Sequence, residues 1–206
     1  MAFATYSDLK TGIANWLGRT DLTDRITEFI SLGETRLKRV LRIREMLKVV
    51  TASTTSGDST VSLPSDFLEV RDFHVSTNPV QTLDYFAPSA FFSNTRTTQS
   101  GLPLQYTVLS TEFQLAPIPD SNYTLKLLYY SQPTALSDSN TSNIFLANCP
   151  DALLYASLVE AEPYLMNDSR LTTWASLLER SVDALQKESI QSQYSGVPLS
   201  MKLTTG

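Results

Sequence analysis

The sequence predicts an α+β protein: a helical bundle of about four helices, interrupted by an inserted antiparallel β-sheet or sandwich and followed by an extended C-terminal tail. Two changes of hydrophobic period support this fold class. Apolar residues recur at helical spacing before about residue 45 and again after residue 150, whereas β-branched and aromatic runs fill the stretch between. We expect bundle halves at 1–45 and 136–190, the β insertion at 46–135 and the tail at 191–206.

Two helices are expected before residue 45. The first carries an apolar stripe over residues 9–17, with Ser7 as its expected N-cap and Gly18 just past its end. The second has a longer stripe over residues 26–41, with Thr23 as its expected N-cap.

The second helix is predicted to be acidic at its start and basic at its end, the order that the helix macrodipole favours. The basic residues are Arg36, Lys38, Arg39, Arg42 and Arg44. They can be read as a solvated helix end that complements the dipole. They can also be read as a contact for an acidic partner, or for nucleic acid passing nearby, and binding would then depend on salt.

Strands are expected at 49–53, 60–63, 67–75, 104–109, 113–115 and 123–130, separated by Pro, Gly and Asn turn signals. The first two form a strand–turn–strand pattern. A short helix is expected at 88–94. These elements together predict the inserted sheet or sandwich.

Helical spacing returns after a polar linker at 137–143. Pro150 suits the first position of a helix, and Pro163 should end or kink that helix. A last helix is expected from Asp168, with an apolar face that includes Trp174.

The tail alternates apolar and other residues, a period of two that is typical of a strand. Its apolar residues are Val197, Leu199, Met201 and Leu203. The segment can be a frayed terminus, or it can add as a strand to the edge of a partner's sheet.

Composition excludes several classes of function. The net charge is −5, with only 18% charged residues, which argues against a protein that grips nucleic acid through a basic surface. One Cys and one His argue against an internal disulfide and against most zinc or iron sites, so we expect no metal and no cofactor. No apolar run is long enough to span a membrane, and the N-terminal residues do not resemble a signal peptide.

No catalytic residues are predicted. His74 stands alone without a placeable nucleophile, and Cys149 lacks a sequence-local base, so both are read as structural. Glu160 and Glu162 are expected on different faces of a helix. Glu179 and Asp183 share a face, as any solvated pair can.

Several segments, in this order and spacing, resemble the head-to-tail adaptor (connector) proteins of short-tailed bacteriophages. They are residues 6–9 (YSDL), 16–22 (WLGRTDL), 34–37 (ETRL), 63–71 (LPSDFLEVR), 115–119 (LAPIP), 123–125 (YTL), 149–155 (CPDALLY), 163–165 (PYL) and Trp174. The resemblance covers residues 6 to about 185. Two places depart from it: residues 143–146 (NIFL) stand where such proteins often have a Trp, and Glu162 stands where a small residue is expected.

The resemblance implies a non-enzymatic virion protein at the head–tail junction, made in the host cytoplasm. Such adaptors form a ring, typically of twelve copies, beneath the portal. They extend the DNA channel, retain the genome until ejection and attach tail, nozzle or fibre proteins. The C-terminal segment is expected to reach the portal, and the acidic composition suits a channel through which DNA passes without specific binding.

Two other classes of function remain open at this point. A tail-associated cell-wall hydrolase would turn over peptidoglycan through a carboxylate. A fibre or receptor-binding module would bind a glycan through the β insertion and would be expected to form trimers.

Overall fold

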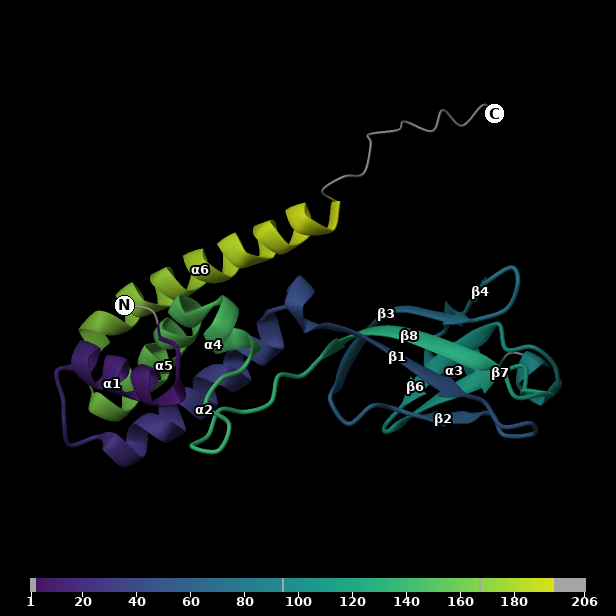
Figure 1. Ribbon diagram of the computed structural model, residues 1–206, viewed down its shortest axis with the longest axis horizontal. Coiled ribbons are helices and arrows are strands. Elements are labelled where there is room, and N and C mark those ends of the chain that lie inside the picture. The colour runs from purple at the N-terminus through teal and green to yellow at the C-terminus, as the bar shows by residue number, and fades with distance from the viewer. Residues whose placement is uncertain (1–2, 94, 167, 195–206) are drawn as a thin grey trace, which may run out of the picture. The chain divides into compact units, whose positions relative to one another are not determined.

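The structure is a computed structural model that describes residues 3–93, 95–166 and 168–194. It divides into two compact units: a helical unit from Met1–Met46 and Pro133–Gly206, and a β unit of Leu47–Gln132 (Figure 1). The β unit is thus inserted between two helical segments of the chain. The predicted fold class, α+β with strands inserted between helices, is confirmed.

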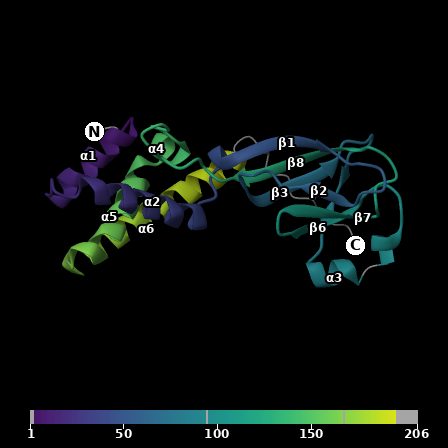
Figure 2. The same cartoon turned by 90° about the horizontal axis from the view of Figure 1, so that it is seen from below.

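The helical unit is assembled around α5. Its elements are α1 (Tyr6–Leu17), α2 (Thr23–Val40), the 3-10 turn η1 (Arg44–Met46), α4 (Ile144–Asn148), α5 (Pro150–Leu165) and α6 (Asp168–Tyr194). The first two helices, α4 and α6 all contact α5 (Figure 2). Accordingly α5 is apolar on most sides, with buried residues that include Leu153, Leu158 and Ala161.

The N-caps differ from the predicted ones. Thr5, not Ser7, caps α1, because its Oγ1 accepts from the Asp8 amide at 3.2 Å and the Asp8 carboxylate accepts from the Thr5 amide at 3.0 Å. Thr23 is the first residue of α2 rather than its cap. Gly18 does end α1, in the left-handed conformation at φ 66°.

The C-terminal helices follow the predicted order with two differences. Pro163 lies inside α5, which ends two residues later at Leu165, so the proline precedes the end rather than forming it. α4 was not predicted. α6 continues to Tyr194, past the predicted start of the extended tail at residue 191.

The β unit contains two four-stranded sheets. One has the order β1 (Leu47–Ser53), β8 (Thr124–Ser131), β3 (Phe67–Val75) and β4 (Gln81–Thr82). The other has the order β2 (Thr60–Ser62), β7 (Glu112–Ala116), β6 (Gln105–Leu109) and β5 (Asp84–Tyr85). All pairings are antiparallel except that of β5 with β6.

Inward-facing side chains of both sheets form one core. Phe73, Leu125 and Leu127 contribute from the first sheet, and Tyr106 and Phe113 from the second. Phe73 and Phe113 have ring centroids 4.8 Å apart. The predicted strands at 49–53 and 60–63 are both present, but they lie in different sheets, so the turn between them crosses from one sheet to the other.

The predicted short helix is present as α3 (Pro88–Phe92), which contacts β6. Its Phe91 is buried whereas Phe92 is 56% exposed. A further 3-10 turn, η2 (Thr95–Thr98), follows it.

Candidate functional site

The five basic residues at the end of α2 do not share one partner. Arg36 donates to the Glu160 carboxylate of α5 through both Nε and Nη2, each at 2.6 Å. This ion pair links two helices of the bundle, so Arg36 has a structural role that the sequence did not reveal.

Arg42 and Arg44 lie beyond the last turn of α2. Nη1 of Arg42 donates to the carbonyl oxygens of Lys38 at 2.9 Å and Leu41 at 2.7 Å. These carbonyls are left unpaired by the end of the helix, and a cation there also complements the dipole. Arg44 approaches Glu45 at 3.4 Å, and its backbone amide donates to Ser189 of α6 at 3.0 Å.

Lys38 and Arg39 complete the basic group. Lys38 is half-buried and its charge lowers the pKa of Glu34, opposing the larger effect of burial. Arg39 is exposed, and within the described ranges no side-chain hydrogen bond or ion pair engages it. Arg39 is therefore the member of the group with the most freedom to contact another molecule.

A shallow apolar groove lies on the helical unit between α2, α5 and α6. It has a volume of about 240 Å³, and its lining includes Leu37, Val40, Val159, Leu178 and Val182. Val40 is 48% exposed. Apolar side chains that line this groove therefore remain in contact with water in the isolated subunit.

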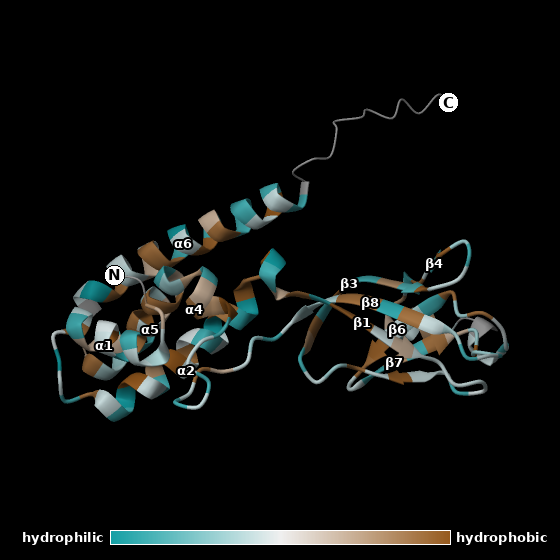
Figure 3. Cartoon of the chain, viewed as in Figure 1, coloured by the Kyte–Doolittle hydropathy of each residue, from teal (hydrophilic) through white to brown (hydrophobic). Residues whose placement is uncertain are grey.

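Helix α6 supplies much of the exposed apolar surface of this unit. Leu178 is buried, but Leu171, Leu177 and Leu185 on the same predicted face are only half-buried. Figure 3 shows hydrophobic and hydrophilic segments alternating along the helix. Sequence periodicity found this face, but only the structure shows how incompletely the unit covers it.

The four tail residues Val197, Leu199, Met201 and Leu203 lie outside the described residues. The last residue that the structure describes before them is Tyr194, at the end of α6.

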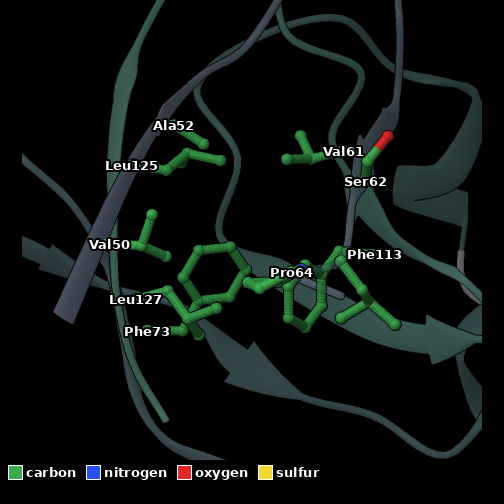
Figure 4. Close-up of a pocket in the computed structure, with 10 residues that line it drawn as sticks. Val50, Ala52, Val61, Ser62, Pro64, Phe73, Phe113, Leu125 and Leu127 are labelled. Atoms are coloured by element: carbon green, nitrogen blue, oxygen red, sulfur yellow. The ribbon is translucent and has the colours of Figure 1, made fainter. Parts of the chain in front are cut away.

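The β unit has an apolar mouth between the edges of its two sheets. Val50 and Ala52 of β1 lie on one side and Val61 of β2 lies opposite, with Phe73 and Phe113 at the base (Figure 4). The cavity volume is about 200 Å³. Sequence reasoning missed this mouth, although the run of uncharged residues from 49 to 56 was a signal for it.

The two side chains with potential reactivity, His74 and Cys149, both have structural surroundings. Nδ1 of His74 lies 2.9 Å from the Asp72 carboxylate, its neighbour two residues before on β3. Cys149 is buried between α4 and α5, and burial raises the pKa of its thiol to about 12. At neutral pH the thiol therefore stays protonated and is a poor nucleophile.

The two glutamates of α5, Glu160 and Glu162, contact different partners. Glu160 pairs with Arg36, whereas Glu162 is fully buried and accepts from Nε1 of Trp174 at 2.8 Å. Nε of Arg170 lies 3.3 Å from the same Glu162 oxygen. Glu162 thus joins α5 to α6, which explains a carboxylate at a position where a small residue was expected.

The part of the chain that the structure describes contains neither a metal-binding cluster nor a membrane-spanning helix. No group of three or more His, Cys, Asp or Glu side chains in the described ranges could hold a metal ion. Among the described helices, none is both long and apolar enough to cross a membrane.

Comparison with known proteins gives one family. A search of the curated proteins found no match. Residues 4–201 match the family model described as SU10 adaptor protein, which covers nearly the whole chain and both units. The resemblance to phage head-to-tail adaptors is thus confirmed, and the chain belongs to the SU10 adaptor protein family.

Proposed function

We propose that this adaptor assembles as a ring of twelve copies beneath the portal, where it extends the DNA channel and holds the genome until ejection. The family match over residues 4–201 is the observation that carries the proposal. The subunit works as a structural component of the virion at the head–tail junction. Packaged DNA passes through the ring without specific binding, in keeping with the net charge of −5.

The helical unit makes the contacts between neighbouring subunits. The groove around Val40 and the half-buried face of α6 support this assignment, because both leave apolar side chains in water in the isolated subunit. Burial of apolar surface contributes about 25 cal/mol per Å², so covering these surfaces favours assembly.

The portal binds the C-terminal segment through Val197, Leu199, Met201 and Leu203. Their alternation supports addition as a strand, in which every second side chain faces the partner.

The β unit faces the tail and attaches nozzle or fibre proteins. The basic end of α2 faces an acidic partner or the DNA, and Arg39 makes the principal contact. This basic group consists of Arg36, Lys38, Arg39, Arg42 and Arg44.

The number of adaptor copies bound to each portal ring tests the proposal. The purified protein is mixed with the portal of its own phage, and the mass of the complex is measured by sedimentation. We expect twelve copies per portal ring for the wild-type chain. A portal that sediments alone at micromolar adaptor would contradict the proposed function.

A matched pair of variants tests the groove. Val40→Asp places a charge in the groove and should prevent the ring from filling. Leu32→Asp is the control, because Leu32 lies on the same helix, is 51% exposed against 48% for Val40, and does not line the groove. Equal binding of the two variants to the portal would show that the groove is not part of the interface between subunits.

A further inference from the structure

Strand β1 presents an unprotected sheet edge. It ends the order β1-β8-β3-β4, so β8 pairs with one side of it and no described strand pairs with the other. Edge strands in native proteins are normally protected by charges, prolines or bulges. Residues 49–53 carry none of these, and Val49 and Val50 are 57% and 37% exposed.

The one charged residue of β1 itself, Lys48, is already neutralised. Nζ of Lys48, at the start of β1, lies 2.6 Å from the Asp66 carboxylate. Asp66 also accepts from the hydroxyl of Tyr129 at 2.8 Å. Lys48 is thus held at one end of β1 and leaves the uncharged edge of residues 49–53 open.

The apolar mouth lies directly beside this edge. Val50 and Ala52 pair with Leu127 and Leu125 in register, so they face the core, and both line the mouth (Figure 4). An engineered apolar cavity of about 150 Å³ is large enough to bind benzene. The mouth, at about 200 Å³, therefore has room for one or two aliphatic side chains.

The C-terminal segment of this chain has the matching chemistry. Twelve residues, 195–206, follow the end of α6 at Tyr194, which is ample length for a strand. The alternating part, 197–203, spans seven residues, as β1 does. It is apolar at every second position, and its other positions hold Pro198, Ser200 and Lys202. Proline is tolerated here because an added strand becomes the new edge.

We propose that, when no portal is present, residues 197–203 of one copy add as a strand to β1 of a second copy, with their apolar side chains over the mouth. The segment and β1 are different surfaces of the same chain, so the contact can repeat head to tail from one copy to the next. The proposal builds on the proposed function in one respect: the portal competes with β1 for this segment.

Disulfide cross-linking between copies tests the contact without any portal. Thr51→Cys and Ser200→Cys are made in separate chains of different mass, because both positions lie on the solvent-facing side of the proposed strand pair. Side chains opposite each other on paired strands are about 5 Å apart, close enough for a disulfide after slight adjustment. The native Cys149 is buried and protonated at neutral pH, so it does not compete.

The expected product is a mixed dimer of the two chains, which forms on oxidation in the absence of portal and does not form when portal is added before the oxidant. The control pairs Thr51→Cys with Asp183→Cys, an exposed position on α6. A mixed dimer no more abundant than in this control overturns the proposal. A third chain carries both Thr51→Cys and Ser200→Cys. If its disulfide forms only within single copies and never between copies, the proposal is likewise overturned.

Hydrogen exchange gives a second readout that needs no cysteine. The Thr54 amide donates to the Tyr123 carbonyl on the β8 side at 2.9 Å, and amides alternate in direction along an antiparallel strand, so those of Val49, Thr51 and Ser53 face the open edge. These three amides should exchange about tenfold faster in a Leu199→Ser, Met201→Ser variant than in the wild type, because the edge is then uncovered. Both positions follow the end of α6 at Tyr194, so the substitutions change no residue of the described helices and strands. Equal exchange rates would exclude the strand addition, while portal binding, measured separately, tests the proposed function.

Discussion

Glu34 of α2 is a buried carboxylate in the helical unit, with 2% of its surface exposed. Its Oε1 accepts from Nδ2 of Asn143 at 2.6 Å, and its two oxygens accept from the Leu136 amide at 3.2 and 3.3 Å. Burial raises its pKa above the ordinary value of 4.5, and these hydrogen bonds oppose the rise. Glu34 therefore secures the chain segment that leads into α4.

The raised pKa of Glu34 predicts a pH dependence of stability. Between pH 4.5 and the higher folded pKa, the native state holds this proton more tightly than the unfolded chain does. The free energy of unfolding should therefore fall as pH rises through that window. In Glu34→Gln, whose amide oxygen can still accept, this component should vanish. Thermal unfolding followed by circular dichroism from pH 4 upward measures it, and parallel profiles for both proteins would contradict the assignment.

Arg39 is the residue at which the basic end of α2 can be tested. Arg39→Gln should weaken binding to the portal a few-fold at low salt and less at high salt, because exposed charge pairs contribute only about 0.2–1 kcal/mol. Arg180→Gln on the exposed side of α6 is the matched control. Affinity is measured by titration at several salt concentrations. Equal affinity for Arg39→Gln and the control would show that Arg39 does not contact the portal.

The helices α2 and α5 pack so closely that Gly33 matters. A Cβ atom at Gly33 would lie 3.0 Å from the Ser157 backbone nitrogen and 3.2 Å from the Ala156 carbonyl carbon. Both of these atoms belong to the backbone of α5, which cannot move without shifting the helix. The absence of a side chain at this position therefore sets the separation of the two helices.

Gly33→Ala should destabilise the protein by about 1–3 kcal/mol through overpacking. Helix propensity alone would predict the opposite, a gain of about 1 kcal/mol for alanine. Ser31→Ala, at an exposed position on the same helix, is the control and should be neutral or slightly stabilising. Chemical denaturation measures both, and a gain in stability for Gly33→Ala would show that the two helices can separate at little cost.

Elements with a strong hydrophobic period were predictable, and those held by distant contacts were not. The strand at Phe67–Val75 was predicted at its observed bounds, because β-branched and aromatic residues fill it. β4 and β5 are two residues long and exist only through pairing with β3 and β6, so no local pattern could reveal them. α4 was missed because it has five residues, although Asn143 does cap it, accepting from the Leu146 amide at 3.0 Å.

The same distinction holds for the candidate site. Exposed charge at the end of α2 was visible in the sequence, but the partner of Arg36 lies 124 residues away on α5. The apolar mouth beside β1 depends on which strands become sheet edges, a property of topology that periodicity does not encode. Sequence reasoning therefore found the charged residues and missed the surface made by packing.

At the scale of the whole molecule, the end of α6 at Tyr194 defines where the C-terminal segment can be removed. Removing residues 195–206 after Tyr194 preserves α6, including the buried Ser189 that accepts from the Arg44 amide. We expect an unchanged circular dichroism spectrum and loss of portal binding. A quadruple Ser replacement at Val197, Leu199, Met201 and Leu203 in the full-length chain should have the same effect. Full portal binding by either variant would refute the role of these residues.

Electron microscopy can show whether this SU10-family adaptor forms a ring on the portal. The protein is mixed with the portal ring of its own phage, and the particles are classified by symmetry. We expect a ring of twelve-fold density beneath the portal. A bare portal at micromolar adaptor would contradict it.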